Sequence, residues 1–321
     1  DPYGTLKGIS LKNCRGLSIT NCTIDNVGKC ISSEYADGAT AFHSVTMITV
    51  DNIRARAHKY FICIDTSDVT AFSQWQVCGD WIITRCNSNY ATETNIWMSG
   101  IDGVNIGMGN VLCMLNYGST TLSDTKAHNI YIGEGDCLHI HDSNLYEAGR
   151  SAVVLGKDGL ISNCAVSGLV ITWPGQIEQG DCIEIYSNHA MQLSISGCTF
   201  DSWTRNAIGI YSGDTSSVEI GDNSYHWEYA PESWLGATSL TLANCWRIYV
   251  DAACTGTLPA RRGYSDVGIV GDGIKDNILG SGWGMSSDRK GLLSGISTVQ
   301  RHTSITAVKS LWALRDFKNQ A

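Results

Sequence analysis

Proline and long apolar runs are scarce in this sequence. Only four of its 321 residues are proline, whereas 34 are glycine, which indicates many tight corners. No apolar run approaches the roughly 18 residues that a transmembrane helix requires. Between the strand-like segments, no apolar residues recur at the spacing of an amphipathic helix. These absences exclude a helical membrane protein and argue against leucine-rich, armadillo and alternating β/α repeats.

The sequence also lacks a basic cluster and a signal peptide. Asp and Glu total 31 against 22 Lys and Arg, giving a formal net charge of −9. Without grouped cations to follow phosphates, nucleic acid is not an expected partner. The first residues, Asp1 to Gly4, do not form a signal peptide, and a strand-like pattern already begins at Ile9. We therefore expect the natural chain to begin upstream, so that the N-terminal part of the fold is truncated.

None of the 13 cysteines forms a Cys-x-x-Cys pair, so the usual zinc signal is absent and no metal or cofactor is expected. Six cysteines follow a short polar or glycine corner: Cys14, Cys22, Cys86, Cys164, Cys198 and Cys245. We expect these six to share one repeat position as small buried thiols. Free thiols favour assembly in a reducing cytoplasm, whereas native disulfides would favour a secreted protein.

The segment from Leu193 to Ile210 serves as the template of a repeat. It holds two short alternating segments, which period two identifies as strands. Copies of the first strand begin at 17, 48, 82, 104, 138, 160, 193, 218 and, less clearly, 240, and copies of the second at 31, 62, 97, 130, 153, 183 and 208. The chain returns to the same position every 23 to 35 residues, a period typical of solenoids. Each unit has too few apolar side chains for its own core, so the copies must stack.

These patterns predict an all-β protein with a right-handed parallel β-helix over residues 1–257. After about Thr257 the repeat fades, and residues 258–321 form a less regular C-terminal segment. Because the end of a solenoid exposes strand edges and core, we expect this segment to cap the helix or to mediate oligomerisation.

The coil length, the Asn-Cys corners and the Leu-x-Ile strands of residues 8–257 resemble the right-handed parallel β-helices of the pectate-lyase-like superfamily. Within it, the pattern is most similar to bacteriophage tailspikes and capsule depolymerases. Gly180-Asp-Cys-Ile-Glu-Ile and Gly135-Asp-Cys-Leu-His-Ile also resemble a polygalacturonase segment, but each lacks one of its paired aspartates. The other polygalacturonase motifs are not found.

The tailspike resemblance implies a homotrimer that binds and cleaves a bacterial surface polysaccharide, either a capsule or an O-antigen. It also implies a virion protein assembled in the host cytoplasm, with a secreted plant-polysaccharide enzyme as the alternative. Two further alternatives are a non-catalytic glycan-binding or adhesion β-helix and a polysaccharide lyase.

Hydrolysis of a glycan requires a proton donor and a second carboxylate. If Ile183 and Ile185 point inward, Glu184 points outward, and the next coil places Tyr211 beside Tyr186. We therefore predict catalytic carboxylates at Glu184, Asp181 and Glu178, with Glu184 as acid or water-activating base and one of the other two as its partner. The predicted substrate-binding residues are Trp173, Tyr186, His189, Arg205 and Tyr211. Trp173 or Tyr186 would stack on a sugar, and Tyr186, His189 and Arg205 would serve a lyase instead.

A second candidate cluster comprises Glu134, Asp136, His139, His141 and Asp142. The two histidines alternate with Leu138 and Ile140, so we expect them on one outer face. A metal site or a general base would use such a pair, although outward polar residues are also ordinary on a strand. A third possibility is Glu34 with Asp65, at equivalent positions of consecutive coils.

Overall fold

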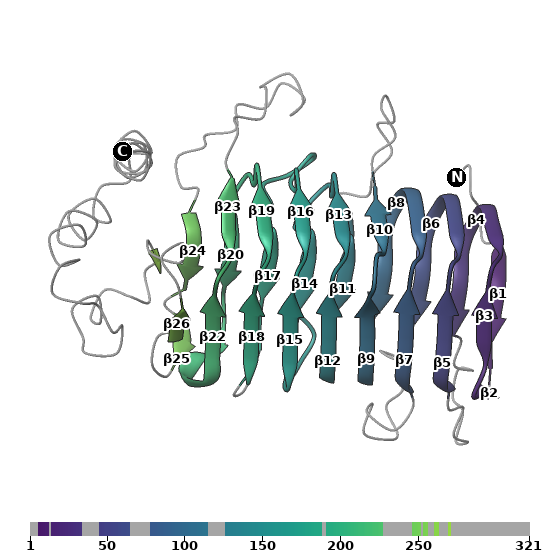
Figure 1. The fold of residues 1–321 in the computed structure, drawn as a ribbon, viewed down its shortest axis with the longest axis horizontal. Helices are drawn as coiled ribbons and strands as arrows, with labels where there is room; N and C mark the ends of the chain where they lie inside the picture. Colours follow the sequence, from purple (N-terminus) through teal and green to yellow (C-terminus); the bar gives the residue numbers. More distant parts are fainter. Residues whose placement is uncertain are drawn as a thin grey trace, which may run out of the picture.

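The computed structural model describes residues 6–12, 14–33, 45–64, 78–114, 126–187, 191–226, 246–251, 253–255, 260–262 and 269–270. These residues form a parallel β-helix, as predicted, with successive coils stacked along the long axis of the molecule (Figure 1). Each regular coil contributes a strand to each of three faces. Among the described residues, no helix is long and apolar enough to cross a membrane.

The first face is a ten-stranded parallel sheet. Its strands are β2 (Cys14–Arg15), β3 (Ser18–Thr20), β5 (Val45–Asp51), β7 (Cys78–Thr84), β9 (Ile101–Gly107), β12 (Gly135–His141), β15 (Cys164–Ser167), β18 (Leu193–Ser196), β22 (Val218–Gly221) and β26 (Ala260–Arg262).

The other two faces belong to one 15-stranded sheet. The second face contains β10 (Val111–Cys113), β13 (Asn144–Tyr146), β16 (Val170–Thr172), β19 (Thr199–Asp201) and β23 (Ser224–His226). The third face contains β1 (Lys7–Leu11), β11 (Ile130–Ile132), β14 (Val153–Leu155), β17 (Ile183–Ile185), β20 (Asn206–Ile210), β24 (Trp246–Val250) and β27 (Ile269–Val270). Three long strands, β4 (Thr23–Ser33), β6 (Arg54–Ile64) and β8 (Asn87–Met98), run from the second face onto the third.

The remaining elements are short. Strands β21 (Gly213–Asp214) and β25 (Cys254–Thr255) pair with each other, and η2 (Thr215–Ser217) is a single 3-10 turn.

Vertical files of apolar side chains fill the space between the faces. On the third face the file consists of Ile31, Ile62, Ile96, Ile130, Val153, Ile183, Ile208 and Ile248, all fully buried. Burying a side chain of this size stabilises the fold by about 1.5–3 kcal/mol. No coil has such a file alone, so stacking supplies the core, as the repeat pattern predicted.

The described corners after the strands of the first face contain left-handed residues. Asn21, Asn52, Arg85, Asp142 and Gly168 all have φ between 44° and 60° there. Asparagine and glycine tolerate this conformation best. The Asn52 side chain also donates a hydrogen bond to Asn21 Oδ1 at 2.7 Å, which joins two neighbouring corners.

Most predicted strand positions agree with the observed register, but two are one residue late. Trp81 and Ile83 point inward on β7, so Ile82 is 46% exposed. The left-handed residue Asp80 (φ 55°) sits directly before Trp81 and offsets the alternation. On β8, Ile96 is the inward residue and Trp97 faces out.

A third strand start, predicted at Leu160, is wrong by four residues. Cys164 pairs with Leu138 and Leu193 in the first face. Leu160 instead precedes β15, where its carbonyl accepts a hydrogen bond from Gly135 N–H.

All the described cysteines are free thiols, but the expectation of a single shared position is wrong. Cys22, Cys86 and Cys198 follow the left-handed corner residue after a strand of the first face, whereas Cys164 follows a left-handed residue, Asn163, that precedes such a strand. Cys164 lies within β15, and Cys14 lies in β2 opposite Val45. Cys245 lies outside the described residues.

Two short strands continue the sheets beyond the predicted boundary at residue 257. Strand β26 pairs with β22, and β27 pairs with β24. The role predicted for residues 258–321 stays a prediction, because nearly all of them lie outside the described residues.

Candidate functional site

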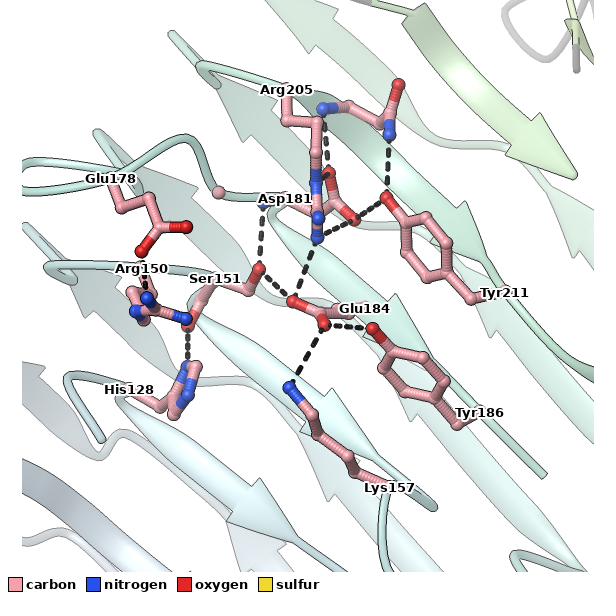
Figure 2. Close-up of polar contacts among 12 residues, drawn as sticks. His128, Arg150, Ser151, Lys157, Glu178, Asp181, Glu184, Tyr186, Arg205 and Tyr211 are labelled. Atoms are coloured by element: carbon pink, nitrogen blue, oxygen red, sulfur yellow. Dashed lines mark hydrogen bonds and ion pairs between the residues drawn. The ribbon is translucent and has the colours of Figure 1, made fainter. Parts of the chain in front are cut away.

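Glu184 stands at the centre of a charged cluster on the third face (Figure 2). On β17, Ile183 and Ile185 point into the core, so the alternation directs Glu184 outward. Its neighbours on the adjacent strands are Val154 and Gly209, which are smaller. The space around Glu184 is therefore occupied by longer polar groups from the ends of the strands.

Asp181 anchors this cluster from within. It is 0% exposed, and its carboxylate accepts hydrogen bonds from Arg205 Nε and Nη2, both at 2.8 Å. The Asn206 N–H (2.8 Å) and the Tyr211 hydroxyl (2.7 Å) also donate to it. Burial raises the pKa of Asp181 to about 6, against the lowering effect of Arg205. A buried carboxylate with every oxygen engaged is suited to holding Arg205 in place rather than to reacting with a substrate.

Gly209 makes this arrangement possible. A Cβ at position 209 would lie 2.3 Å from Asp181 Oδ2, closer than any side chain tolerates. A residue other than glycine would therefore displace either the carboxylate or the strand.

Glu184 accepts hydrogen bonds from the Ser151 hydroxyl and from the Tyr186 hydroxyl at 2.6 Å, and it forms an ion pair with Arg205 Nη2 at 2.9 Å. Lys157 Nζ lies 3.8 Å from its other side, at Oε1. Burial alone would raise its pKa, but Arg205, the two hydroxyl donors and Lys157 together lower it. Glu184 is therefore an anion near neutral pH, able to accept a proton but poorly suited to donate one.

Two further carboxylates lie at the edge of the third face where its strands end: Glu134 follows β11 and Asp158 follows β14, whereas Asp181 precedes β17. Asp158 Oδ1 accepts a hydrogen bond from the Tyr131 hydroxyl at 2.7 Å. Glycines provide room for both groups: a Cβ on Gly133 would lie 1.9 Å from Asp158 Oδ2, and one on Gly159 would lie 2.8 Å from Glu134 Cδ. Burial, and then the Asp158 charge, raise the pKa of Glu134. Glu134 is thus protonated more readily than an ordinary glutamate and is suited to donate a proton.

Aromatic rings extend along the face on both sides of these carboxylates. The Trp97 ring stacks on Tyr131 with centroids 3.9 Å apart, and Tyr60 meets Trp97 edge-on at 6.4 Å. Further along the axis, Tyr186 stacks on Tyr211 at 5.3 Å. Tyr249 continues this second group, 5.8 Å from Tyr211. We call these groups the two aromatic rows.

The structure thus brings together five of the residues predicted for the first site: Asp181, Glu184, Tyr186, Arg205 and Tyr211. Glu178 lies to one side with a 57% exposed side chain and pairs with Arg150. Trp173 occupies the left-handed corner after β16, with φ 55°. His189, Glu34 and Asp65 lie outside the described residues.

The second predicted cluster is divided between two faces. His139 and His141 do share an outer surface, with ring centroids 4.2 Å apart, but that surface is the first face. There Asp142 lies 2.9 Å from His141 Nδ1, and Asp136 accepts hydrogen bonds from Ser162 and Asn163. Glu134 instead lies beside Asp158.

One group among the described residues has the spacing of metal ligands. The ligand atoms of Asp102, Asp136 and Cys137 lie within 4.8 Å of one another on the first face. Asp102 and Cys137 are exposed, an arrangement that is common without a bound ion.

The strand pattern alone did not point to five residues of this face: Trp97, Tyr131, Lys126, Lys157 and Asp158. The outward position of Trp97 follows from the correct register of β8, in which Ile96 points inward. Asp158 lies in the turn between Gly156 and Gly159, so these closely spaced glycines were the available signal. No protein-family model matches the chain, and no curated protein is significantly similar to it in sequence.

Proposed function

We propose that this protein hydrolyses a bacterial surface polysaccharide, a capsule or an O-antigen, that lies along the third face. The observation that supports this proposal is the pair of aromatic rows flanking carboxylates whose pKa values are shifted in opposite directions. Aromatic faces pack against the apolar faces of sugars, and carboxylates with opposite shifts are typical of an acid and a base in one site.

In this proposal Glu184 removes a proton from the attacking water or attacks the sugar itself. Glu134 donates the proton that the leaving oxygen requires, and the charge of Asp158 helps to keep it protonated. Arg205, held by Asp181, keeps Glu184 ionised. Hydrolysis is favoured over elimination because burial, and then the charge of Glu184, raise the pKa of Tyr186, which keeps its hydroxyl protonated near neutrality and leaves no tyrosinate to act as the base.

The proposal extends to a tailspike-type protein that acts as a homotrimer in a phage virion. The parallel β-helix and the free thiols of the described coils support it.

The test is incubation with a panel of purified capsule and O-antigen polysaccharides. New reducing ends without ultraviolet-absorbing unsaturated products would support hydrolysis, and unsaturated products would indicate a lyase. We expect Glu184→Gln to lower the cleavage rate at least about 100-fold, because a proton-transfer group is lost. Asp222→Asn is the control, since Asp222 is an exposed residue of a left-handed corner that asparagine accepts. Full activity in Glu184→Gln would refute the assignment of Glu184.

A non-catalytic glycan-binding protein is the second candidate. The observation that favours it is the engagement of Asp181 and Glu184 by the same guanidinium of Arg205. Binding to a polysaccharide without any product, in both wild type and Glu184→Gln, would establish this alternative.

A further inference from the structure

Ion pairs between neighbouring coils line the edge where the chain enters the third face. In each pair a cation and a carboxylate of adjacent coils meet: Lys59 with Glu93, Arg150 with Glu178, and Arg205 with Asp181. The carboxylate lies in the following coil in the first two pairs and in the preceding coil in the third. The charges along this edge are therefore neutralised within the protein wherever the pattern holds.

Lys126 interrupts the pattern. It lies in the coil of β11, between the coil of Glu93 and the coil of Arg150, and its residue is exposed. Among the residues that the structure describes, no carboxylate forms an ion pair with it. Its Nζ lies 5.2 Å from the centroid of the Trp97 ring, which stacks on Tyr131.

An exposed ammonium over an indole ring is attracted by only about 0.5–1 kcal/mol. Trp97 thus positions the Lys126 charge without satisfying it. An incoming anion would gain a charged hydrogen bond from the ammonium and an apolar wall from the ring. A sugar with a carboxylate on its ring offers both features, because its C–H groups and its charge lie in the same residue.

We propose that Lys126 and Trp97 form a subsite for a carboxylate-bearing sugar, so that the polysaccharide is acidic. This inference rests on the proposed function and names its substrate class. Lys157 is a weaker candidate, since its Nζ lies 5.5 Å from the Tyr186 centroid but also 3.8 Å from Glu184.

The carboxylates Asp158 and Glu134 disfavour binding of an acidic sugar at their own position on the third face. Asp158 is exposed beside Glu134, so an acidic sugar is repelled there and a neutral residue fits better. The charged residue of the glycan is therefore directed to Lys126.

The test begins with binding measurements on purified bacterial polysaccharides with and without uronic acids. For an acidic polysaccharide that binds, chemical reduction of its carboxyl groups to alcohols should weaken binding about tenfold, the value of one charged hydrogen bond. Equal binding of the reduced polymer, or preference for neutral polymers, would overturn the subsite while leaving the proposed function standing. If no member of the panel is bound or cleaved, the proposed function itself fails.

The variant Lys126→Met tests the residue directly. We expect about tenfold weaker binding of the acidic polysaccharide and a smaller dependence on salt, with an unchanged melting temperature because the side chain is exposed. Lys126→Arg should retain most of the affinity. Lys12→Met is the matched control, an exposed lysine after β1 near the N-terminal end of the described chain. Wild-type affinity in Lys126→Met would contradict the proposal.

Discussion

His58 is a buried polar residue that the proposed mechanism does not use. It is 0% exposed, and its Nε2 lies 2.9 Å from the Ser88 hydroxyl, which donates to Asn95 Oδ1 at 2.5 Å. Burial lowers the pKa of His58 to about 4, despite its contact with Asn95. A neutral imidazole is thus built into the core between the second and third faces.

This burial predicts a loss of stability in mild acid. The folded pKa is depressed below the unfolded value of about 6.5, so the stability that His58 contributes is complete above about pH 6.5 and is lost as the pH falls through about 4. By about pH 5 the expected loss is about 2 kcal/mol. Urea unfolding at about pH 7 and about pH 5 should therefore show a smaller loss in His58→Gln than in wild type.

The difference in lost stability between wild type and His58→Gln separates the effect of His58 from that of other titrating groups. His128 acts in the same direction, because burial also lowers its pKa to about 4. Asp181 acts in the opposite direction, since its pKa is raised to about 6. Both are present in wild type and in the variant. Equal losses of stability in the two proteins would show that His58 does not titrate as its burial requires.

For single residues, the alternation of side chains along a strand was enough to place part of the candidate site. The pattern Ile183-Glu184-Ile185 turned Glu184 outward, and the pairing of Ile183 with Ile208 brought Tyr211 beside Tyr186. Alternation does not report burial, so it did not reveal that Asp181 is fully enclosed by Arg205 and its neighbours. Nor does it describe turns, which is why Asp158 was missed.

Among the elements, the turn between β14 and β15 is the most constrained around the site. Gly156 has φ +77°, and a Cβ there would lie 1.9 Å from the Tyr186 carbonyl oxygen. That oxygen belongs to the backbone of the next coil and cannot move away alone. We expect Gly156→Ala to destabilise the protein by at least about 3 kcal/mol and to abolish cleavage by shifting Tyr186 and Glu184.

Gly16→Ala is the control for this prediction. Gly16 has a similar φ of +70°, but no atom lies within 4 Å of the position its Cβ would occupy. Only the conformational strain remains, about 1–2 kcal/mol. Thermal or urea unfolding of the two variants compares steric conflict with backbone strain, and equal effects would contradict the close approach of the two coils.

The register of most strands was predictable because inward residues of the stacked coils are almost all Ile, Leu or Val. It failed where a left-handed residue offset the alternation, as at Asp80 before Trp81. A cysteine in an inward position had the same effect: Cys164 takes the place that a leucine holds in the coils on either side. The pattern of apolar residues therefore predicts how many coils there are and roughly where they lie better than it predicts which residue begins each strand.

For the whole molecule, stacking replaces the covalent links that a cysteine-rich chain would otherwise use. The described cysteines are free, and several lie in the files that form the core. Burial raises the pKa of Cys30 and Cys164 to about 12, which keeps these thiols protonated and unreactive. The fold therefore requires no oxidising environment.

The burial of most of the described thiols predicts how the native protein reacts with a thiol reagent. Cys137 is exposed and should react in the native state, more slowly than a free thiol because burial and then the charges of Asp136 and Asp102 raise its pKa. Buried thiols such as Cys164 should react only as fast as the coils open. After denaturation without reductant, all 13 cysteines should be titrated. A reducing agent should leave the melting temperature unchanged. A titre well below 13, together with a lower melting temperature after reduction, would show native disulfides and favour a secreted protein over one assembled in a cytoplasm.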